Sequence, residues 1–195
     1  YRLDASAGKA ELVGRLGWPL VALCACGGRA YGVLAVGGRT QLAEVDPYTA
    51  RTQFIGELPG WIGGLCEHRG RLLGVGQGGV WEIDPATGRG QALAARGRWP
   101  ELPGPVAVDK GGQAYVAVRS GEVVYLASLD LERRDTTILG AIGHGYLGGL
   151  AFLGDVLYAA PGDGRLIEVD PRTGRATREL PMAPVRAFSG LTRWP

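Results

Sequence analysis

Several residue types that build common functional sites are scarce in this chain of 195 residues. Three cysteines are too few, and too odd in number, for a disulfide framework. The longest apolar runs, such as WPLVALCA, fall well short of the roughly 20 residues that a membrane-spanning helix needs. The 21 basic and 19 acidic side chains are interspersed, with a net charge of +2, so no basic stripe indicates a nucleic-acid ligand. We expect a soluble folded protein with no transmembrane segment and no nucleic-acid partner.

The three cysteines are expected to be reduced. Cys24 and Cys26 are separated by one residue, so on a strand they share a face, where a disulfide between them is geometrically awkward. Cys66 has no obvious partner in the sequence. We expect all three to be buried.

Glycine, in contrast, is abundant, and with proline it marks out a repeat. The 34 glycines and 12 prolines are spread along the whole chain, which favours many short elements joined by turns. The segments YRLDASAGKAEL, AEVDPYTARTQF, WEIDPATGRGQA and IEVDPRTGRATREL resemble one another. Their aspartates, with one further copy, are spaced by 42, 38, 46 and 40 residues and are Asp4, Asp46, Asp84, Asp130 and Asp170.

A second landmark lies upstream of the later aspartates and has a more constant period. It reads ALCACGGRAYGV, GLCEHRGRLLGV, AVDKGGQAYVAV and GLAFLGDVLYAA, and a partial copy, GLTRWP, closes the chain. Its anchor residues are spaced by 42, 42, 43 and 41 residues and are Ala22, Gly64, Val106, Gly149 and Gly190. A constant period in this range indicates a repeat architecture.

Each unit reads as short strands. Apolar and polar residues alternate over four to seven positions and then stop at glycine, which is typical of strands joined by tight turns. AYGVLAV, LLGVG, AYVAV and LYAAP form one expected strand, and TQLAEV, GVWEI, VVYLASL and RLIEV the next. In DPATG and DPRTG the aspartate caps its own turn, proline fixes φ at the first corner and glycine supplies a left-handed residue. Four strands in about 42 residues predict one blade of a β-propeller.

The segment GGLAFLGDVLYAAPGDGRLIEVDPRTG resembles the blade repeat of bacterial propellers of the quinoprotein-like, NHL-like and gluconolactonase-like groups. The resemblance covers almost the full chain and implies an all-β propeller. It does not give an activity, because this blade is shared by proteins of unrelated function. The WD dipeptide that would favour a WD40 repeat is missing from the blade ends.

One propeller domain of five blades is expected over residues 1–195. Four repeats cover approximately 13–52, 53–90, 91–137 and 138–177, and residues 178–195 with 1–12 form a composite blade that closes the ring. About 15 residues, the second strand and its following loop, have no counterpart in that composite blade. Three explanations stay open: the closing blade has fewer strands, residues beyond a terminus are missing, or one chain's end completes another's blade. The oligomeric state is therefore open.

Loops entering the innermost strands commonly carry ligands in propellers, so the resemblance directs attention to them. Each such loop here contains a large aromatic, which suits stacking on a sugar, a planar ligand or a partner's side chain. The alternative is that these aromatics are wedges packed between neighbouring blades. The candidate ligand-binding residues are Trp18, Trp61, Trp99, His144, Tyr146, Arg186 and Phe188.

Histidine and cysteine give little support for a metal site. His144 lies among glycines in IGHGYLGG and would donate, accept or ligate there, but it has no local metal partner, which favours an exposed loop residue. His68 falls in a turn expected at the surface. Cys24 and Cys66 occupy equivalent positions of neighbouring inner strands, where a narrow channel requires small apolar side chains. Without histidine partners, a soft-metal site is disfavoured.

Catalysis is the less favoured interpretation. A gluconolactonase-like enzyme would need carboxylates and an amide around a metal, and the chain contains no asparagine. A quinoprotein dehydrogenase would need a larger ring and a calcium site. We therefore expect no metal and no cofactor, and a non-catalytic binding or assembly module that contacts a protein or carbohydrate through one propeller face. The alternatives are a hydrolase or lyase with a site around His144 and an accessory subunit of a larger complex.

The compartment stays open between two expectations. Propellers of the resembled groups are often exported to the periplasm or the outside, whereas an unpaired number of cysteines fits a reducing cytoplasm. No signal peptide is visible in the chain.

Overall fold

The structure is a computed structural model and describes residues 1–93, 103–133, 135–143, 145–182, 185 and 188–194. All regular secondary structure in this described part consists of β-strands. It contains no helix long and apolar enough to cross a membrane.

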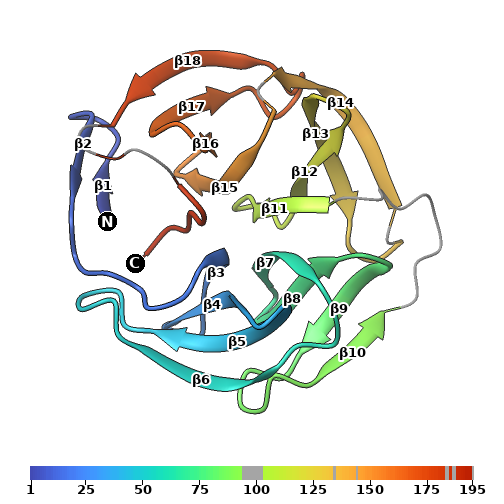
Figure 1. Cartoon of the computed structure of the whole chain (residues 1–195). Helices are drawn as coiled ribbons and strands as arrows, with labels where there is room; N and C mark the ends of the chain where they lie inside the picture. Colours follow the sequence, from blue (N-terminus) through green and yellow to red (C-terminus); the bar gives the residue numbers. More distant parts are fainter. Residues whose placement is uncertain (94–102, 134, 144, 183–184, 186–187, 195) are drawn as a thin grey trace.

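Four sheets, each of four antiparallel strands, are arranged around one axis, and they form the predicted β-propeller (Figure 1). Blade 1 consists of β3 (Leu20–Cys26), β4 (Arg29–Val36), β5 (Arg39–Val45) and β6 (Thr52–Glu57). Blade 2 consists of β7 (Ile62–His68), β8 (Arg71–Gly76), β9 (Gly79–Ile83) and β10 (Gly90–Leu93). Blade 3 consists of β11 (Pro103–Val108), β12 (Ala114–Ser120), β13 (Val123–Asp130) and β14 (Asp135–Gly143). Blade 4 consists of β15 (Leu147–Leu153), β16 (Val156–Pro161), β17 (Arg165–Val169) and β18 (Ala176–Pro181).

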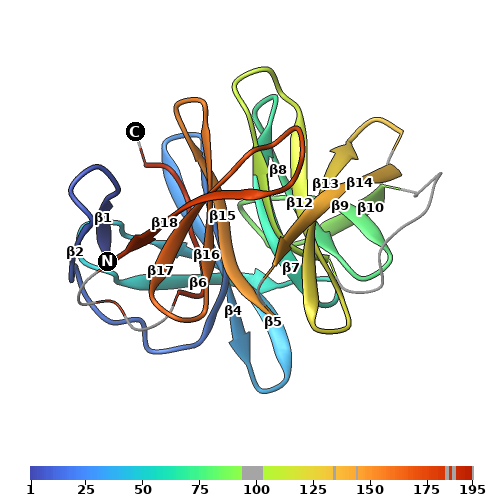
Figure 2. The ribbon, with the colours of Figure 1, turned by 90° about the horizontal axis from the view of Figure 1, so that it is seen from above.

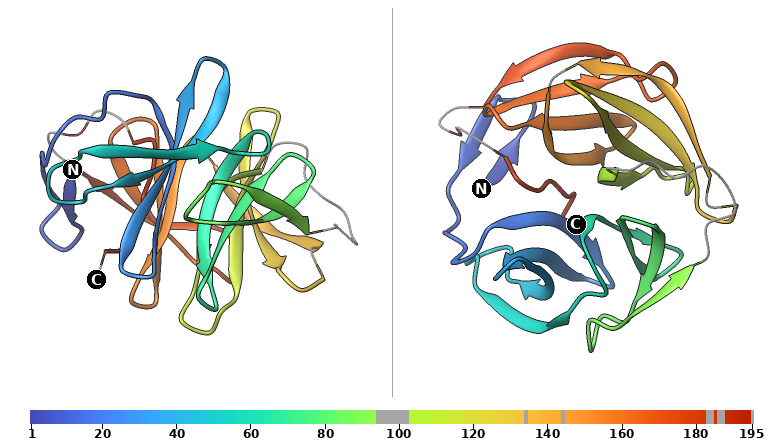
Figure 3. Two further views of the ribbon diagram at one scale, coloured as in Figure 1. Left: turned by 90° about the horizontal axis from the view of Figure 1, so that it is seen from below. Right: turned by 45° about the vertical axis from the view of Figure 1, so that its right-hand side comes forward.

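The remaining part of the ring, between blade 4 and blade 1, is formed by the two ends of the chain. The hairpin of β1 (Arg2–Asp4) and β2 (Lys9–Glu11) lies at the periphery, and residues 188–194 run between β15 and β3 near the axis (Figures 1 and 3). The amide of Ala25 on β3 donates to Thr192 Oγ1 at 3.2 Å, which ties the inner segment to blade 1. We call β1, β2 and residues 188–194 the closing blade.

The sheets end later than the repeat boundaries expected above. The expected repeats, 13–52, 53–90, 91–137 and 138–177, end at residues that lie in the fourth strand of each blade. Each sheet ends only after its fourth strand, so its outermost strand crosses the boundary. The reason is that the aspartate turn is the most visible feature of the repeat, although it lies inside a blade rather than between two blades.

The anchor residues of the repeat lie at the axis. In all four complete blades the register between the innermost strand and the second strand shifts just before the anchor, for example between Leu20 and Ala22 and between Leu147 and Gly149. Such bulges bend a strand locally. A cavity of only about 10 Å³ remains at the axis, close to the smallest volume that holds one water. Its lining includes all five anchors: Ala22, Gly64, Val106, Gly149 and Gly190.

At the anchors Gly64 and Gly149 glycine is needed because other parts of the chain approach closely around the axis. A Cβ on Gly64 would lie 2.7 Å from the carbonyl oxygen of Gly104 in the next blade, and one on Gly149 would lie 2.5 Å from Leu191 Cβ. Neither contact is compatible with normal packing. The propeller axis is therefore closed at the level of the anchors, and this level offers no room for a channel ligand.

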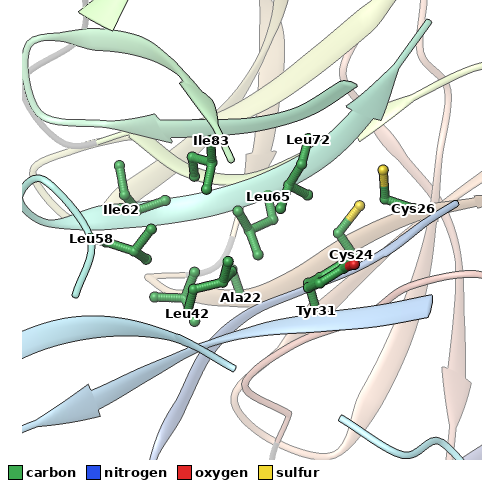
Figure 4. Packing of buried hydrophobic residues seen from close by; sticks show 11 residues of the cluster. Ala22, Cys24, Cys26, Tyr31, Leu42, Leu58, Ile62, Leu65, Leu72 and Ile83 are labelled. Atoms are coloured by element: carbon green, nitrogen blue, oxygen red, sulfur yellow. The ribbon is translucent and has the colours of Figure 1, made fainter. Parts of the chain in front are cut away.

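Apolar side chains fill the interfaces between neighbouring blades. Figure 4 shows the cluster between blades 1 and 2, in which Leu42 of blade 1 packs with Ile62 and Leu72 of blade 2. Two further clusters join blades 2 and 3 and blades 3 and 4. A fourth joins blade 4 to the closing blade, where Leu3 packs against buried residues such as Leu166. Burial of each large side chain contributes roughly 1.5–3 kcal/mol, so these interfaces dominate the stability of the ring.

The aspartates of the repeat cap their turns as predicted. Asp46 Oδ1 accepts hydrogen bonds from the amides of Tyr48 (2.8 Å) and Thr49 (3.1 Å), and these bonds hold the pKa of Asp46 below its usual range. Side-chain and backbone donors in the corresponding turns lower the pKa of the other four aspartates in the same way, namely Asp4, Asp84, Asp130 and Asp170. Each carboxylate is used to shape its own turn.

These turns also join neighbouring blades. A Cβ on Gly140, in the outermost strand of blade 3, would overlap the carbonyl oxygen of Thr173 in the aspartate turn of blade 4. Gly56 meets Thr87 of blade 2 in the same way. In the segment between β2 and β3, a Cβ on Gly14 would lie 2.6 Å from the carbonyl oxygen of Thr49 in the aspartate turn of blade 1. We call these three contacts the glycine–turn contacts.

His68 differs from its predicted surface position. It is the last residue of β7 and only 7% exposed. Gly112 of blade 3 packs against its ring, with a hypothetical Cβ 3.6 Å from His68 Cε1. The histidine is buried because the turn of the next blade covers it, a tertiary contact that the local sequence does not reveal.

Candidate functional site

The described loops that lead into the innermost strands lie on one side of the ring. The turns that follow these strands lie together on the opposite side (Figure 2). We call the first side the entry face and define it by residues 17–19, 59–61 and 145–146. Three of the aromatic residues predicted for ligand binding, Trp18, Trp61 and Tyr146, come from these loops.

Three of the predicted aromatics are exposed on the entry face. Trp18 is 44% exposed, Trp61 49% and Tyr146 55%. Phe188 is only 8% exposed and packs in the core cluster between blade 4 and the closing blade, so it belongs to the interior rather than to an accessible surface. The other three predicted residues lie outside the described residues and are Trp99, His144 and Arg186.

The Trp61 loop is held by hydrogen bonds to blade 1. The amide of Leu58 donates to the carbonyl oxygen of Thr40 at 3.0 Å, and the hydroxyl of Thr40 donates to the carbonyl oxygen of Gly60. Thr40 is 2% exposed, so the second bond also satisfies a buried polar group. The carbonyl oxygen of Trp61 accepts from the amide of Gln77 at 3.4 Å. The exposed indole is therefore carried on a fixed backbone.

The other two aromatics are supported by packing. Trp18 makes an edge-on contact with Phe54 of β6, with ring centroids 6.0 Å apart and an interplanar angle of 69°. The carbonyl oxygen of the neighbouring Pro19 accepts from the amide of Ala35 at 2.9 Å. Tyr146 lies over Gly162, where an added Cβ would come within 3.2 Å of its ring. Each aromatic thus presents part of its surface while the rest is held in place.

Charged groups near the entry face are paired with one another. Arg39, at the start of β5, contacts both carboxylate oxygens of Glu57 at 2.9 Å. Arg165, at the start of β17, pairs with Asp163 and Glu179. These pairs are exposed, so each contributes little to stability. Their effect is to neutralise charge beside the aromatics, which leaves a surface suited to apolar and stacking contacts.

The buried cysteines have the properties of structural residues. Desolvation raises the pKa of Cys66 to about 12, with smaller contributions from Glu67 and Cys26. Burial likewise raises the pKa of Cys24 and of Cys26. A thiol in this state is protonated and is a poor nucleophile. Within the described ranges, no group of three or more histidine, cysteine or acidic side chains is arranged to hold a metal ion.

Sequence reasoning missed one concave region. A cleft of about 1060 Å³ opens at the closing blade, between β1 and residues 188–194. Its lining includes Leu12, Tyr48 and Trp194, none of which the sequence singles out. The available signal was the shortfall of about 15 residues in the last repeat, which leaves space where the other blades have a strand.

Comparisons with known proteins support the fold and identify no family. No protein-family model and no curated protein matches the chain. Among solved structures, it is similar to a chain of the Kuenenia stuttgartiensis hydrazine synthase, with a TM-score of 0.53 and 15% identity over 85% of this chain and 50% of that chain. It is also similar to a chain of a nidogen/laminin complex, with a TM-score of 0.57 and 10% identity over 89% of this chain and 84% of that chain. The chain thus spans half of the hydrazine synthase chain, and identities this low show a shared β-propeller fold alone.

Proposed function

We propose that this propeller is a non-catalytic binding module that contacts a protein partner through the entry face. The observation that carries the proposal is the set of three half-exposed aromatics, Trp18, Trp61 and Tyr146, held on the entry-face loops of blades 1, 2 and 4. Tyrosine and tryptophan on a supported backbone supply contact area with little loss of conformational entropy, and they are frequent at the energetic centres of interfaces. Neutralised charges beside them add to this support.

The comparisons are compatible with this proposal without identifying a partner. One of the similar solved structures is a complex of two proteins, nidogen and laminin. A β-propeller therefore occurs in a protein–protein assembly, and the same use is proposed for this chain. A carbohydrate ligand is the alternative occupant of the same aromatic surface. The hydrolase or lyase hypothesis around His144 stays a prediction, because that residue lies outside the described part of the chain.

The test compares two variants of the whole chain. Trp61→Ala with Tyr146→Ala removes two entry-face aromatics, and Ile138→Ala, a 54% exposed residue of β14, is the matched control. Each protein is immobilised and exposed to an extract of the native host. Candidate partners recovered from the extract are then purified and titrated by calorimetry. We expect a direct partner whose affinity falls at least tenfold with the double variant and is unchanged with Ile138→Ala.

Two results would contradict the proposal. One is a purified partner that binds the double variant as tightly as the unmodified protein. The other is specific binding on an oligosaccharide array, lost in the double variant, with no protein partner detected. The second result would identify a carbohydrate as the ligand of the same surface.

A further inference from the structure

The innermost strands of the four complete blades pair along one edge only. β3, β7, β11 and β15 are the terminal strands of their sheets, and their second edges face one another around the axis (Figure 1). In the part of the chain that the structure describes, no backbone hydrogen bond joins two of these strands. The amides and carbonyl groups on the axis-facing edges therefore need partners of another kind.

The amide of Ala25 shows how one of these groups is satisfied. It donates to Thr192 Oγ1 at 3.2 Å, so it points away from β4 and toward the closing blade. In an antiparallel ladder the amide and carbonyl group of one residue point to the same edge, and the edge alternates from one residue to the next. The ladder between β3 and β4 is regular from Ala22 to Cys26. The amide and carbonyl group of Leu23, two residues before Ala25, therefore face the axis as well.

Backbone groups from three blades converge on the small cavity at the axis. Leu23 lines this cavity. Leu65 and Leu150 line it too, and they take the same place in blades 2 and 4, one residue after the anchors Gly64 and Gly149. The register of the ladder that follows the bulge is the same in these three blades, so the same backbone edge faces the axis in each.

The lining of the cavity is shielded from bulk solvent. Leu65 is 3% exposed and Leu150 2%, and the lining residues Ala22 and Val106 are also buried. Buried backbone groups are almost always paired, either with protein groups or with ordered water. The bulge before each anchor adds to the demand for partners, because a bulge leaves its extra residue outside the ladder.

The volume and chemistry of the cavity select its occupant. A volume of about 10 Å³ is close to the minimum for one water molecule and excludes an organic ligand. Water both donates and accepts, and a buried water typically makes about three hydrogen bonds, so one molecule can serve amides and carbonyl groups together. A monatomic anion would pair with the amides and leave the carbonyl groups without a donor.

We propose that the axial cavity binds one ordered water molecule, which hydrogen-bonds to axis-facing backbone groups of Leu23, Leu65 and Leu150. The water links the innermost strands of blades 1, 2 and 4 at the level where the repeat brings its anchors together. This site lies inside the ring and does not depend on the proposed function of the entry face.

The test measures contacts between water and backbone amides in the whole, isotope-labelled chain by NMR. We expect the amide of Leu23, together with that of Leu65 or Leu150, to give cross-peaks with water of opposite sign in NOESY and ROESY spectra, which is the signature of a long-lived bound water. The amide of Leu42, fully buried in β5, should give none. Thr192→Val removes a hydroxyl whose exchanging proton could imitate water, and the contact at Leu23 should remain.

A matched pair of variants locates the water in the cavity. Ala22→Val and Ala43→Val enlarge two buried alanines of blade 1 by the same amount, but only Ala22 lines the cavity. We expect Ala22→Val to abolish the water contacts, because the added side-chain volume exceeds that of the cavity, and Ala43→Val to retain them. Thermal melts establish that both variants fold. If one does not, the spectra of the unmodified chain and of Thr192→Val decide.

Three results would overturn the proposal. The first is the absence of long-lived water contacts at the Leu23 amide of the unmodified chain. The second is a folded Ala22→Val variant that keeps these contacts. The third is a chloride titration that shifts the Leu23 amide resonance and removes its contact with water, which would identify an anion as the ligand of the cavity.

Discussion

Blade 4 and the closing blade are neighbours in the ring, but the chain builds them in different ways. Blade 4 is a continuous meander from β15 to β18, in which every strand pairs with the next along the sequence. The closing blade joins a hairpin at residues 2–11 to a segment at residues 188–194. It shares a core cluster with blade 4 through Leu3, and blades 1 and 4 both contribute to the lining of the cleft beside it. The difference teaches that one repeat pattern can supply both a continuous four-stranded meander and a unit assembled from two distant segments of the chain.

Core substitutions should separate the two kinds of blade most strongly. Leu126→Ala removes a fully buried side chain of blade 3, and we expect it to lower the free energy of unfolding by about 3–4 kcal/mol. Leu3→Ala affects a partly buried residue of the closing blade and should lower it by about 1 kcal/mol. Urea unfolding curves measure both values. Equal losses would mean that the hairpin is as integrated as a complete blade.

The glycine–turn contacts allow a second matched pair of substitutions. Gly140→Ala drives a methyl group into the Thr173 carbonyl between two complete blades and should destabilise the protein by about 3 kcal/mol. Gly14→Ala makes the corresponding clash between blade 1 and the segment that joins β2 to β3. We expect this change to release the β1–β2 hairpin locally, with faster amide hydrogen exchange there and a small change in the global midpoint. A full global loss with Gly14→Ala would show that the ring unfolds as one unit through that contact.

The aspartate turns predict that the effect of pH on stability also differs between blade 4 and the closing blade. The pKa of Asp170 is lowered in the folded protein, so its stabilisation is present above its unfolded pKa of about 3.9 and is lost as the pH falls through the folded value. Asp170→Asn keeps a capping acceptor but cannot titrate. We expect this variant to lose less stability than the unmodified protein between about pH 4 and the folded pKa. Asp4→Asn should change the acid profile of hydrogen exchange in the hairpin and leave the global profile nearly unaltered. Thermal melts and exchange across this range decide between these outcomes.

The smallest expected effect concerns the turn that receives the closing blade. Ala50 has φ of 57°, whereas Gly88 and Gly174 occupy the same corner in blades 2 and 4 with φ of 73° and 68°. A side chain is strained in this region, so Ala50→Gly should stabilise the protein by about 0.5–1 kcal/mol. The melting temperature reports the change. A destabilised variant would show that the Ala50 methyl group, which packs near Gly14, matters more for docking than its backbone strain.

Much of the fold could be predicted from the sequence because the repeat consists of residues with strong backbone preferences. Asp170, Pro171 and Gly174 specify a turn whatever surrounds them, and anchors such as Gly64 and Gly149 reflect crowding at the axis. These features depend on residues close in sequence or on a regular period. They can therefore be recognised in the sequence without knowledge of tertiary contacts.

The candidate sites depend on contacts that a local sequence does not contain. Trp61 and Phe188 both lie in entering loops, yet the first is half exposed and the second is in the core. The difference arises because Phe188 packs where blade 4 meets the closing hairpin, a contact between residues far apart in the chain. His68 is buried by the turn of the next blade for the same reason. The shape of the cleft likewise depends on where the hairpin docks.

The hydrogen bond from Ala25 to Thr192 also has a consequence for the order of folding. It joins residues 167 apart in sequence, and the bond from Trp194 Nε1 to the Tyr48 hydroxyl (3.2 Å) joins residues 146 apart. The strand pairs inside the complete blades are between neighbours in the chain, and such local contacts form fast, whereas contacts of high sequence separation form slowly. On a ribosome, residues 20–181 can assemble into blades before residues 188–194 have emerged. Ring closure therefore waits for residues 188–194, and until it happens the nascent protein is an open arc.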